Sequence, residues 1–279
     1  MKMAPGCYEC LRRLIHQAAE LATADVALRQ RTINEAMKIL DDEFSYSQLS
    51  IVIATRIQKV VREVTHNPDP YRAMKEREMT LARELYPQLR PRYKDDLQGC
   101  LKLAAAANAI DFFREPGSIK DDIRKPVSFV IDESERFEAK LKNASKVLYL
   151  ADNTGELCFD LPLVKWMQQF VQVIYIVKPS PVQDDLTLED VRKSGLEDEF
   201  GKVISTGIAS PGIVFSLSSA QFQREFESTD LIFAKGMGHY EALSELPTEG
   251  RFFYCLKTKC QPVADSLEVP LNSYVAMLQ

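Results

Sequence analysis

Short apolar runs alternate with helix-like stretches throughout the second half of the chain, and this alternation limits the folds that the chain can adopt. Helical stretches such as 157–169 and 217–227 separate the runs. The runs themselves are 147–151, 171–177, 202–205, 230–234 and 251–256. Strands that alternate with helices are typical of right-handed crossover units around a parallel sheet. The second half is therefore predicted to have an α/β fold with a doubly wound, mainly parallel sheet.

The first half has a different periodicity, because its apolar residues recur at helical spacing and strand-like alternation is nearly absent. Examples of this spacing are Leu11, Leu14, Ile15, Ile33, Ala36, Met37, Ile53, Ile57 and Val60. We expect an additional N-terminal all-helical domain over residues 1–145, which packs on and partly caps an α/β domain over residues 146–279. The charged stretch 133–146 is the predicted boundary.

The residues Asp152-Asn153-Thr154-Gly155-Glu156 follow the first apolar run directly. Ligand sites of open α/β sheets lie just beyond the carboxyl ends of parallel strands. A carboxylate and an amide oxygen at such a position suit a hard cation such as magnesium or manganese. The alternative is that Asp152 or Asn153 caps the following helix, with Glu156 in its first turn.

Polar residues also follow the other predicted strands. They are Lys178 and Asp184-Asp185 after the second run, Lys235-Gly236-Met237-Gly238-His239-Tyr240-Glu241 after the fourth, and Lys257-Thr258-Lys259-Cys260 after the fifth. If these strand ends meet, two carboxylates, an amide and several lysines share one rim, which suits a phosphate ester and a metal ion. Each residue also has a simpler interpretation, because lysines beyond strands are commonly solvated and Asp185 could be a carboxylate favoured by a helix dipole.

These motifs, in this order, resemble the metal-dependent damage-control phosphatases, a family once described only as a domain of unknown function. The resemblance extends to the first half, where Cys7-Tyr-Glu-Cys10, Asn67-Pro-Asp-Pro-Tyr71 and Asn108-Ala-Ile-Asp111 look like the small archaeal and bacterial branch. It implies a phosphatase that acts on small phosphorylated metabolites such as sugar phosphates. It further implies that Asp152, Asn153 and Asp185 bind Mg²⁺ or Mn²⁺, with Co²⁺ or Ni²⁺ as alternatives, and that Lys259 contacts the substrate phosphate.

On this basis we expect two sets of site residues. The expected catalytic residues are Asp152, Lys259, Lys235 and Glu156. The expected substrate-binding residues are Asn108, Asp111, Lys178, Gly236, His239 and Glu241. The nucleophile is either a metal-activated water or Asp152 itself, which would form an acyl phosphate.

The sequence departs from the family pattern near the expected site. His239 and Asp184 stand where the family usually has asparagine, and Ala107 replaces the usual glycine before Asn108. His239 would act as a proton donor to the leaving group if it titrates near neutral pH, or only as a hydrogen-bonding or surface residue.

The composition argues against some other classes of protein. A net charge of −5 does not favour a nucleic-acid surface, and in the most basic stretch, 72–94, glutamates alternate with the cations as on a solvated helix face. No run approaches the roughly 18 apolar residues of a membrane span, and no signal-peptide core is present. We therefore expect a cytoplasmic protein without membrane or nucleic-acid partners.

The six cysteines are dispersed, which favours thiols over a disulfide framework. Cys7 and Cys10 are spaced for zinc or for a redox pair, with His16 as a further ligand, but no second such motif completes a zinc site. On a helix the two sulfurs would simply share a face and pack.

Two other classes of function remain compatible with these patterns. The first is a nucleotide-dependent transferase, such as a methyltransferase, in which Gly236-Met237-Gly238 forms a glycine loop; the missing third glycine makes this signal weak. The second is a non-enzymatic protein that binds a phosphorylated metabolite. Metal-dependent turnover would distinguish an enzyme from such a binding protein.

Overall fold

The computed structural model describes residues 1–110, 116–247 and 250–279. Within this part of the chain the sheet has seven strands, in the order β1-β7-β6-β5-β2-β3-β4. The strands are β1 (Phe129–Asp132), β2 (Lys146–Leu150), β3 (Gln172–Val177), β4 (Lys202–Ser205), β5 (Leu231–Lys235), β6 (Phe252–Lys257) and β7 (Tyr274–Leu278). The predicted α/β fold with a mainly parallel sheet is confirmed, because β6, β5, β2, β3 and β4 all pair in parallel.

Two strands at one edge run the other way. Strand β7 pairs antiparallel with β6, and β1 pairs parallel with β7. Strand β1 lies in the region that was expected to be all helical up to residue 145, so that expectation is wrong at Phe129–Asp132. The strand has only four residues, too few to give a clear alternation of apolar residues in the sequence.

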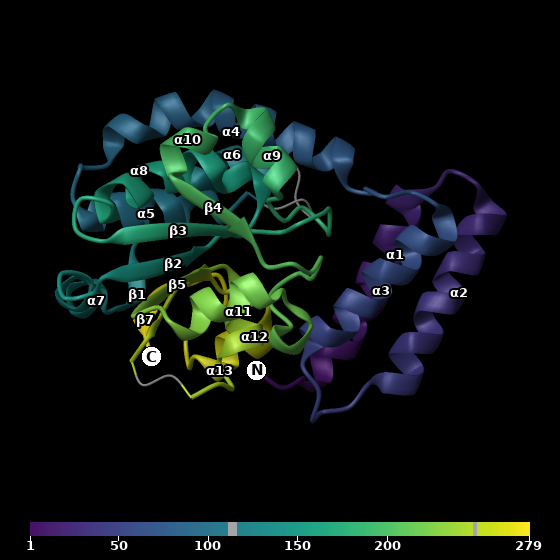
Figure 1. Ribbon diagram of the computed structural model, residues 1–279. Helices are drawn as coiled ribbons and strands as arrows, with labels where there is room; N and C mark the ends of the chain where they lie inside the picture. The colour runs from purple at the N-terminus through teal and green to yellow at the C-terminus, as the bar shows by residue number, and fades with distance from the viewer. Residues whose placement is uncertain (111–115, 248–249) are drawn as a thin grey trace.

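Helices cover both faces of the sheet (Figure 1). One face packs against α4 (Arg72–Leu89), α5 (Leu97–Ala107), α7 (Ser134–Leu141), α8 (Leu157–Met167), α9 (Leu188–Ser194) and α10 (Glu197–Phe200). The other packs against α11 (Ala220–Glu227), α12 (Met237–Leu243) and α13 (Gln261–Ser266). Successive strand residues alternate between these two cores, as Val147 and Tyr149 do against Leu148 and Leu150. The remaining elements include helix α6 (Pro116–Ile123) and the 3-10 helices η1 (Arg90–Arg92), η2 (Thr154–Glu156) and η3 (Phe215–Leu217).

The first three helices form a unit of their own beside the sheet (Figure 1). Helices α1 (Pro5–Ala22), α2 (Val26–Glu43) and α3 (Ser50–Thr65) share a separate apolar core. Helix α3 joins this unit to the rest of the molecule, because Thr55 hydrogen-bonds Ser210 (2.7 Å) and Arg62 donates to the carbonyl of Pro181 (2.8 Å). These contacts hold the three-helix unit against the loops that follow β3 and β4, at the carboxyl ends of these strands.

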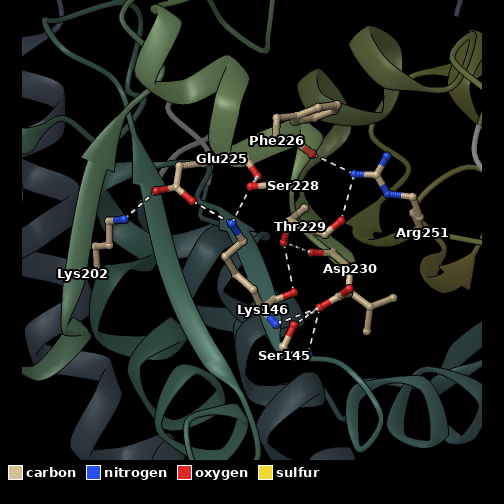
Figure 2. Close-up of polar contacts among 10 residues, drawn as sticks. Ser145, Lys146, Lys202, Glu225, Phe226, Ser228, Thr229, Asp230 and Arg251 are labelled. Carbon is tan, nitrogen blue, oxygen red and sulfur yellow. Dashed lines mark hydrogen bonds and ion pairs between the residues drawn. The ribbon is translucent and has the colours of Figure 1, made fainter.

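The amino ends of several strands are tied together by polar side chains (Figure 2). The carboxylate of Asp230, just before β5, accepts hydrogen bonds from the backbone amides of Ser145 and Lys146 at the start of β2 (2.8 and 3.0 Å). Glu225 of α11 pairs with Lys146 and with Lys202 at the start of β4. These contacts hold the amino ends of the strands together. Most of the functional residues predicted from the sequence lie at the opposite, carboxyl ends of the strands.

Candidate active site at the carboxyl edge of the sheet

The carboxyl ends of four strands meet beside the point where the strand order reverses. From β2 the chain continues to β3 and β4 on one side, whereas β5 and β6 lie on the other side of β2. Ligand sites of open α/β sheets form in the crevice at such a point. The polar residues that follow these strands are Asp152 and Asn153 after β2, Lys178 and Asp185 after β3, Gly236 after β5, and Lys259 after β6.

Two loops at this edge bind each other through their backbones. Asn153 and Asp185 form an isolated antiparallel bridge, and the amide of Leu186 donates to the carbonyl of Asp152 (2.9 Å). Directly afterwards, Thr187 caps helix α9 with a reciprocal capping box. These contacts bring the three expected metal ligands, Asp152, Asn153 and Asp185, to neighbouring positions.

Asp152 is enclosed from two sides. Asn108 donates from its amide nitrogen to Asp152 Oδ2 (3.0 Å) and to Glu156 Oε1 (2.9 Å). Gly236 has a positive φ of 80°, and a Cβ atom at this position would overlap the Asp152 carboxylate. Burial raises the pKa of the Asp152 carboxyl well above its ordinary value, and the negative charges of Glu156 and Asp185 raise it further. The carboxylates of Glu156 and Asp185 thus crowd negative charge around Asp152, and a bound cation would relieve it.

Behind Asp152 lies a buried ionic network. Lys235 is fully buried; its ammonium lies 2.5 Å from Glu156 Oε2 and also pairs with Asp160. Asp160 accepts a further hydrogen bond from the hydroxyl of Tyr175 (2.8 Å). Two carboxylates compensate the buried lysine, as buried charges require. Lys235, which was expected to be catalytic, therefore lies behind the site in contact with Glu156 and Asp160.

Lys178 occupies a similar position beside Asp185. Its ammonium donates to the carbonyl of Gly212 (2.5 Å) and lies 3.8 Å from Asp185 Oδ2. Burial lowers the pKa of Lys178, and the negative charge of Asp185 opposes this shift. Burial also raises the pKa of Asp185 to about 6, although Lys178 and Lys75 act in the opposite direction. Lys178 therefore compensates part of the negative charge at the rim.

The side chains at this rim fit a divalent cation. No group of three or more His, Cys, Asp or Glu side chains in the described residues is arranged to hold a metal, so a site here depends on the amide of Asn153 as well as on two carboxylates. Asp185 Oδ2 is buried and has no hydrogen-bond partner among the described residues. Counted together, the carboxylates of Asp152, Glu156, Asp160 and Asp185 and the ammonium groups of Lys178 and Lys235 carry a net charge of −2 when ionised. A bound divalent cation would neutralise this charge.

A cavity of about 850 Å³ adjoins the rim. Its lining includes Ala109 and Met237, the residues that follow Asn108 and Gly236, and Lys259. The charge of Lys259 lowers the pKa of Asp152, so this lysine acts electrostatically on the carboxylate cluster. The volume falls in the range of small-molecule sites, roughly 300–1,000 Å³. A ligand in this cavity would meet Lys259 at the end next to Asp152.

Three expected substrate-binding residues remain to be placed. The Glu241 carboxylate accepts a hydrogen bond from Ser50, and its carbonyl accepts one from the N-terminal ammonium, so Glu241 joins α12 to α3. Nδ1–H of His239 donates to the carbonyl of Lys235 (2.7 Å). Burial lowers the pKa of His239 to about 3, which favours the neutral ring at pH 7 over an imidazolium proton donor. Asp111 lies outside the described residues.

The sequence interpretation missed two buried residues of this region. Asp160 lies four positions after Glu156 in a helical stretch, and this spacing was the available signal that the two share a face. Lys75 belongs to the stretch interpreted as a solvated helix face, yet it is 4% exposed and pairs with Asp69 (3.3 Å) and Asp190 (3.1 Å). Helix α4 packs over the 154–156 turn, a tertiary contact that charge patterning does not reveal.

Cys7 and Cys10 lie on α1, and all six cysteines are free thiols in the described part of the chain. Cys10 and Cys260 line the cavity, but neither belongs to a group of three or more His, Cys, Asp or Glu side chains that could hold a metal among the described residues. None of the described helices combines the length and the apolarity needed to cross a bilayer.

Comparison with known proteins identifies the family. Residues 3–275 match the damage-control phosphatase ARMT1-like domain. A damage-control phosphatase of Pyrococcus horikoshii is 32% identical, with 99% of this chain and 98% of that protein aligned, and one of Archaeoglobus fulgidus is 29% identical over 99% of both chains. The crystal structure of a DUF89 family protein from Pyrococcus horikoshii matches with a TM-score of 0.90 and 31% identity, covering 100% of this chain and 99% of that one. The resemblance inferred from the sequence motifs is confirmed, and the chain belongs to the family of the damage-control phosphatase ARMT1-like domain.

Proposed function

We propose that this chain is a metal-dependent phosphomonoester hydrolase that acts on small phosphorylated metabolites, such as sugar phosphates or related damaged metabolites. One observation carries the proposal. Asp152, Asn153 and Asp185, whose side chains carry oxygen donors, occupy neighbouring positions at the switch point of the sheet, and Lys259, whose charge acts on Asp152, lines an adjoining cavity. The similarity to proteins named damage-control phosphatases supports the same class of reaction.

The proposed roles follow from the charges. When bound by Asp152, Asn153 and Asp185, Mg²⁺ or Mn²⁺ would neutralise phosphoryl oxygens and activate a water molecule. Lys259 acts as a point charge that binds the phosphoryl group and stabilises its developing charge. Water oxygen forms the new bond to phosphorus, the ester oxygen leaves, and the products are an alcohol and inorganic phosphate.

The residues behind the rim hold these groups in place. Asn108 fixes one oxygen of Asp152, and its own Oδ1 accepts a hydrogen bond from the Lys257 amide (3.0 Å). Glu156 and Lys235 form the buried pair to which Asn108 is also bonded. We therefore assign Asn108, Glu156 and Lys235 a positioning role. Asp152, as a metal ligand, and Lys259, which binds the phosphoryl group, act directly in the reaction.

Phosphate release tests this function. Metal-stripped protein is assayed with p-nitrophenyl phosphate and a panel of sugar phosphates, and Mg²⁺, Mn²⁺, Co²⁺ or Ni²⁺ is added back. We expect release that requires added metal and is lost in Asp185→Asn but not in Lys142→Gln, a change at a surface lysine paired with Glu138. The proposal would be refuted if phosphate release did not depend on added metal, or if Asp185→Asn released phosphate as fast as the wild-type protein.

The same assay addresses the other functions that the sequence allowed. A protein that only binds phosphorylated metabolites would retain metal and phosphate without turnover. The glycine loop of a transferase is not needed to explain Gly236, because the close approach of the Asp152 carboxylate already accounts for a glycine there.

A further inference from the structure

The chain segment that carries Asp185 is held by hydrogen bonds at both of its ends. It runs from the end of β3 to the start of α9, and the amide of Lys178 donates to the carbonyl of Leu186 (2.8 Å). Asp190, in the first turn of α9, accepts hydrogen bonds at Oδ2 from the amide and the hydroxyl of Thr187 (3.0 and 2.6 Å). The placement of Asp185 therefore depends on Asp190, which lies five residues further along the chain.

Lys75 of α4 binds the same oxygen of Asp190. Its ammonium lies 3.1 Å from Asp190 Oδ2 and 3.3 Å from Asp69 Oδ2. The lysine side chain is 5% exposed and the two carboxylates are 18% and 13% exposed, so solvent does little to weaken these pairs. Loss of Lys75 would leave two largely buried carboxylates close together without this cation. Lys75 therefore holds Asp190 in place against α4.

Asp69 connects Lys75 to the three-helix unit. It belongs to the Asn67-Pro-Asp-Pro-Tyr71 segment, to which the proposed catalytic mechanism assigns no role. The amide of Asp69 donates to Asn67 Oδ1 (3.0 Å), and Asn67 Nδ2 donates to the carbonyl of Ala22 at the end of α1 (3.0 Å). Lys75 thus links a turn that is anchored on the three-helix unit to the residue that holds the Asp185 segment.

Helix α4 also contacts the loop that carries the other two proposed metal ligands. It packs over the 154–156 turn, and a Cβ atom added at Gly155 would lie 3.2 Å from Cβ of Glu78. Glu78 follows Lys75 by three residues, so the two share a face of the helix. One face of α4 therefore contacts both loops of the proposed metal site.

We infer that Lys75 is a positioning residue for the proposed metal site. Through Asp190 it fixes the loop that carries Asp185 against the loop of the other two ligands, and this placement sets the affinity for the divalent cation. Partners that orient metal ligands typically change metal affinity by roughly 10–100-fold when they are removed. This inference rests on the proposed metal-dependent function and deepens it.

The charge of Lys75 and its positioning role predict opposite effects on metal binding. Burial raises the pKa of Asp185, and the positive charges of Lys178 and Lys75 oppose the rise, so the charge of Lys75 reaches this ligand. If Lys75 acted through its charge alone, its removal would leave the site more negative and strengthen the binding of a cation. If Lys75 positions the Asp185 loop, its removal weakens the binding.

A Mn²⁺ titration of metal-stripped protein, with free Mn²⁺ followed by electron paramagnetic resonance, distinguishes the two effects. For Lys75→Met we expect a Kd for Mn²⁺ about tenfold or more above that of the wild-type protein. The double variant Lys75→Met/Asp69→Asn loses one positive and one negative charge, so its net charge is unchanged and Asp69 is not left as an uncompensated carboxylate. It should show the same loss of affinity, at a temperature where thermal unfolding shows each variant to be folded.

Another cation of the same helix supplies a matched control. Arg77 lies at an exposed position of α4, so Arg77→Met should keep the wild-type Kd for Mn²⁺. Unchanged or tighter Mn²⁺ binding in the double variant would overturn the inference, while the proposed metal site would stand. If the wild-type protein itself bound no Mn²⁺, the proposed function would fall, and this inference with it.

Discussion

At the scale of single residues, the site depends on how closely other groups approach Asp152. Asn108 orients one carboxylate oxygen, and Gly236 leaves the space that this carboxylate fills. The sequence showed a glycine loop but gave no indication of which group lay against it. The structure identifies that group as the proposed metal ligand.

Gly236→Ala should therefore abolish or strongly reduce phosphatase activity, because a Cβ atom would displace the Asp152 carboxylate. Gly236 has a φ of 80° and a ψ of 167°, a combination essentially restricted to glycine, so the backbone strain should also cost about 1–3 kcal/mol of stability. Gly195→Ala is the control: Gly195 has a similar φ of 75° and no atom within 4 Å of an added Cβ. Because its ψ of 10° lies in the left-handed helical region, Gly195→Ala should lose about 1–2 kcal/mol of stability and keep activity. Equal activity in the two variants, measured with thermal unfolding in parallel, would contradict this role of Gly236.

The sequence was sufficient to predict the positions of some expected site residues but not of others. The strand pattern alone predicted that Asp152, Asn153 and the Asp184-Asp185 pair lie close together, because parallel strand ends converge. The choice of Asp185 as the ligand came from the resemblance to the family. The placement of Lys235 and Glu241 could not be predicted, because it depends on which side chains of other elements surround them. Lys235 meets Glu156 and Asp160 from another strand–helix unit, and Glu241 meets Ser50 of the three-helix unit.

At the scale of the elements, β2, β3, β5 and β6 were predictable because each is a mostly buried apolar run of five or six residues. The edge strand β4, with four residues, was also predicted from its sequence. Strand β1 was not, since its four residues alternate between half-buried and exposed and none of them is fully buried. The strands are also aligned at the edge opposite the site, where Asp230 bonds the start of β2 (Figure 2). These hydrogen bonds, those from Ser145 above all, lower the pKa of Asp230 below its ordinary value.

Asp230→Ala should lower the free energy of unfolding by about 1 kcal/mol at pH 7, since water replaces part of the lost hydrogen bonds. A carboxyl with a depressed pKa in the folded state contributes stability at pH values above its unfolded pKa, about 3.9. That contribution is lost as the pH falls through the folded pKa. The difference between wild type and variant should therefore shrink when urea unfolding is repeated near pH 3.

Glu227→Ala, at an exposed position on α11, controls for the loss of a surface carboxylate. A difference between wild type and Asp230→Ala that stays constant or grows on acidification would exclude the proposed linkage.

At the scale of the whole molecule, the three-helix unit and the α/β part share the cavity. Arg13 and Cys10 enter its lining from α1, whereas Lys257 and Lys259 come from the end of β6. Glu241 joins the two parts through Ser50 at the start of α3. The sequence predicted that helices pack on the α/β half, but the hydrogen bonds from α3 to the α/β part pair residues 119 to 191 positions apart, and no local pattern encodes them.

Glu241→Ala should loosen the first turn of α3, because Ser50 loses its carboxylate partner. We expect faster amide hydrogen exchange at the start of α3 and a retained kcat with p-nitrophenyl phosphate. Glu245→Ala, which removes an exposed carboxylate near the N-terminus, should leave exchange in α3 unchanged. A fall in kcat with unchanged exchange would instead support the direct substrate contact that the sequence suggested for Glu241.

The most direct test of the whole account is a Mn²⁺ titration of metal-stripped protein, with free Mn²⁺ followed by electron paramagnetic resonance. We predict a tight site in the wild-type protein that is lost in Asp152→Asn and in Asp185→Asn. It should persist in Asp160→Asn, because Asp160 pairs with Lys235 behind the rim. Unchanged Mn²⁺ binding in both the Asp152 and the Asp185 variants would contradict the central claim that these carboxylates form the metal site.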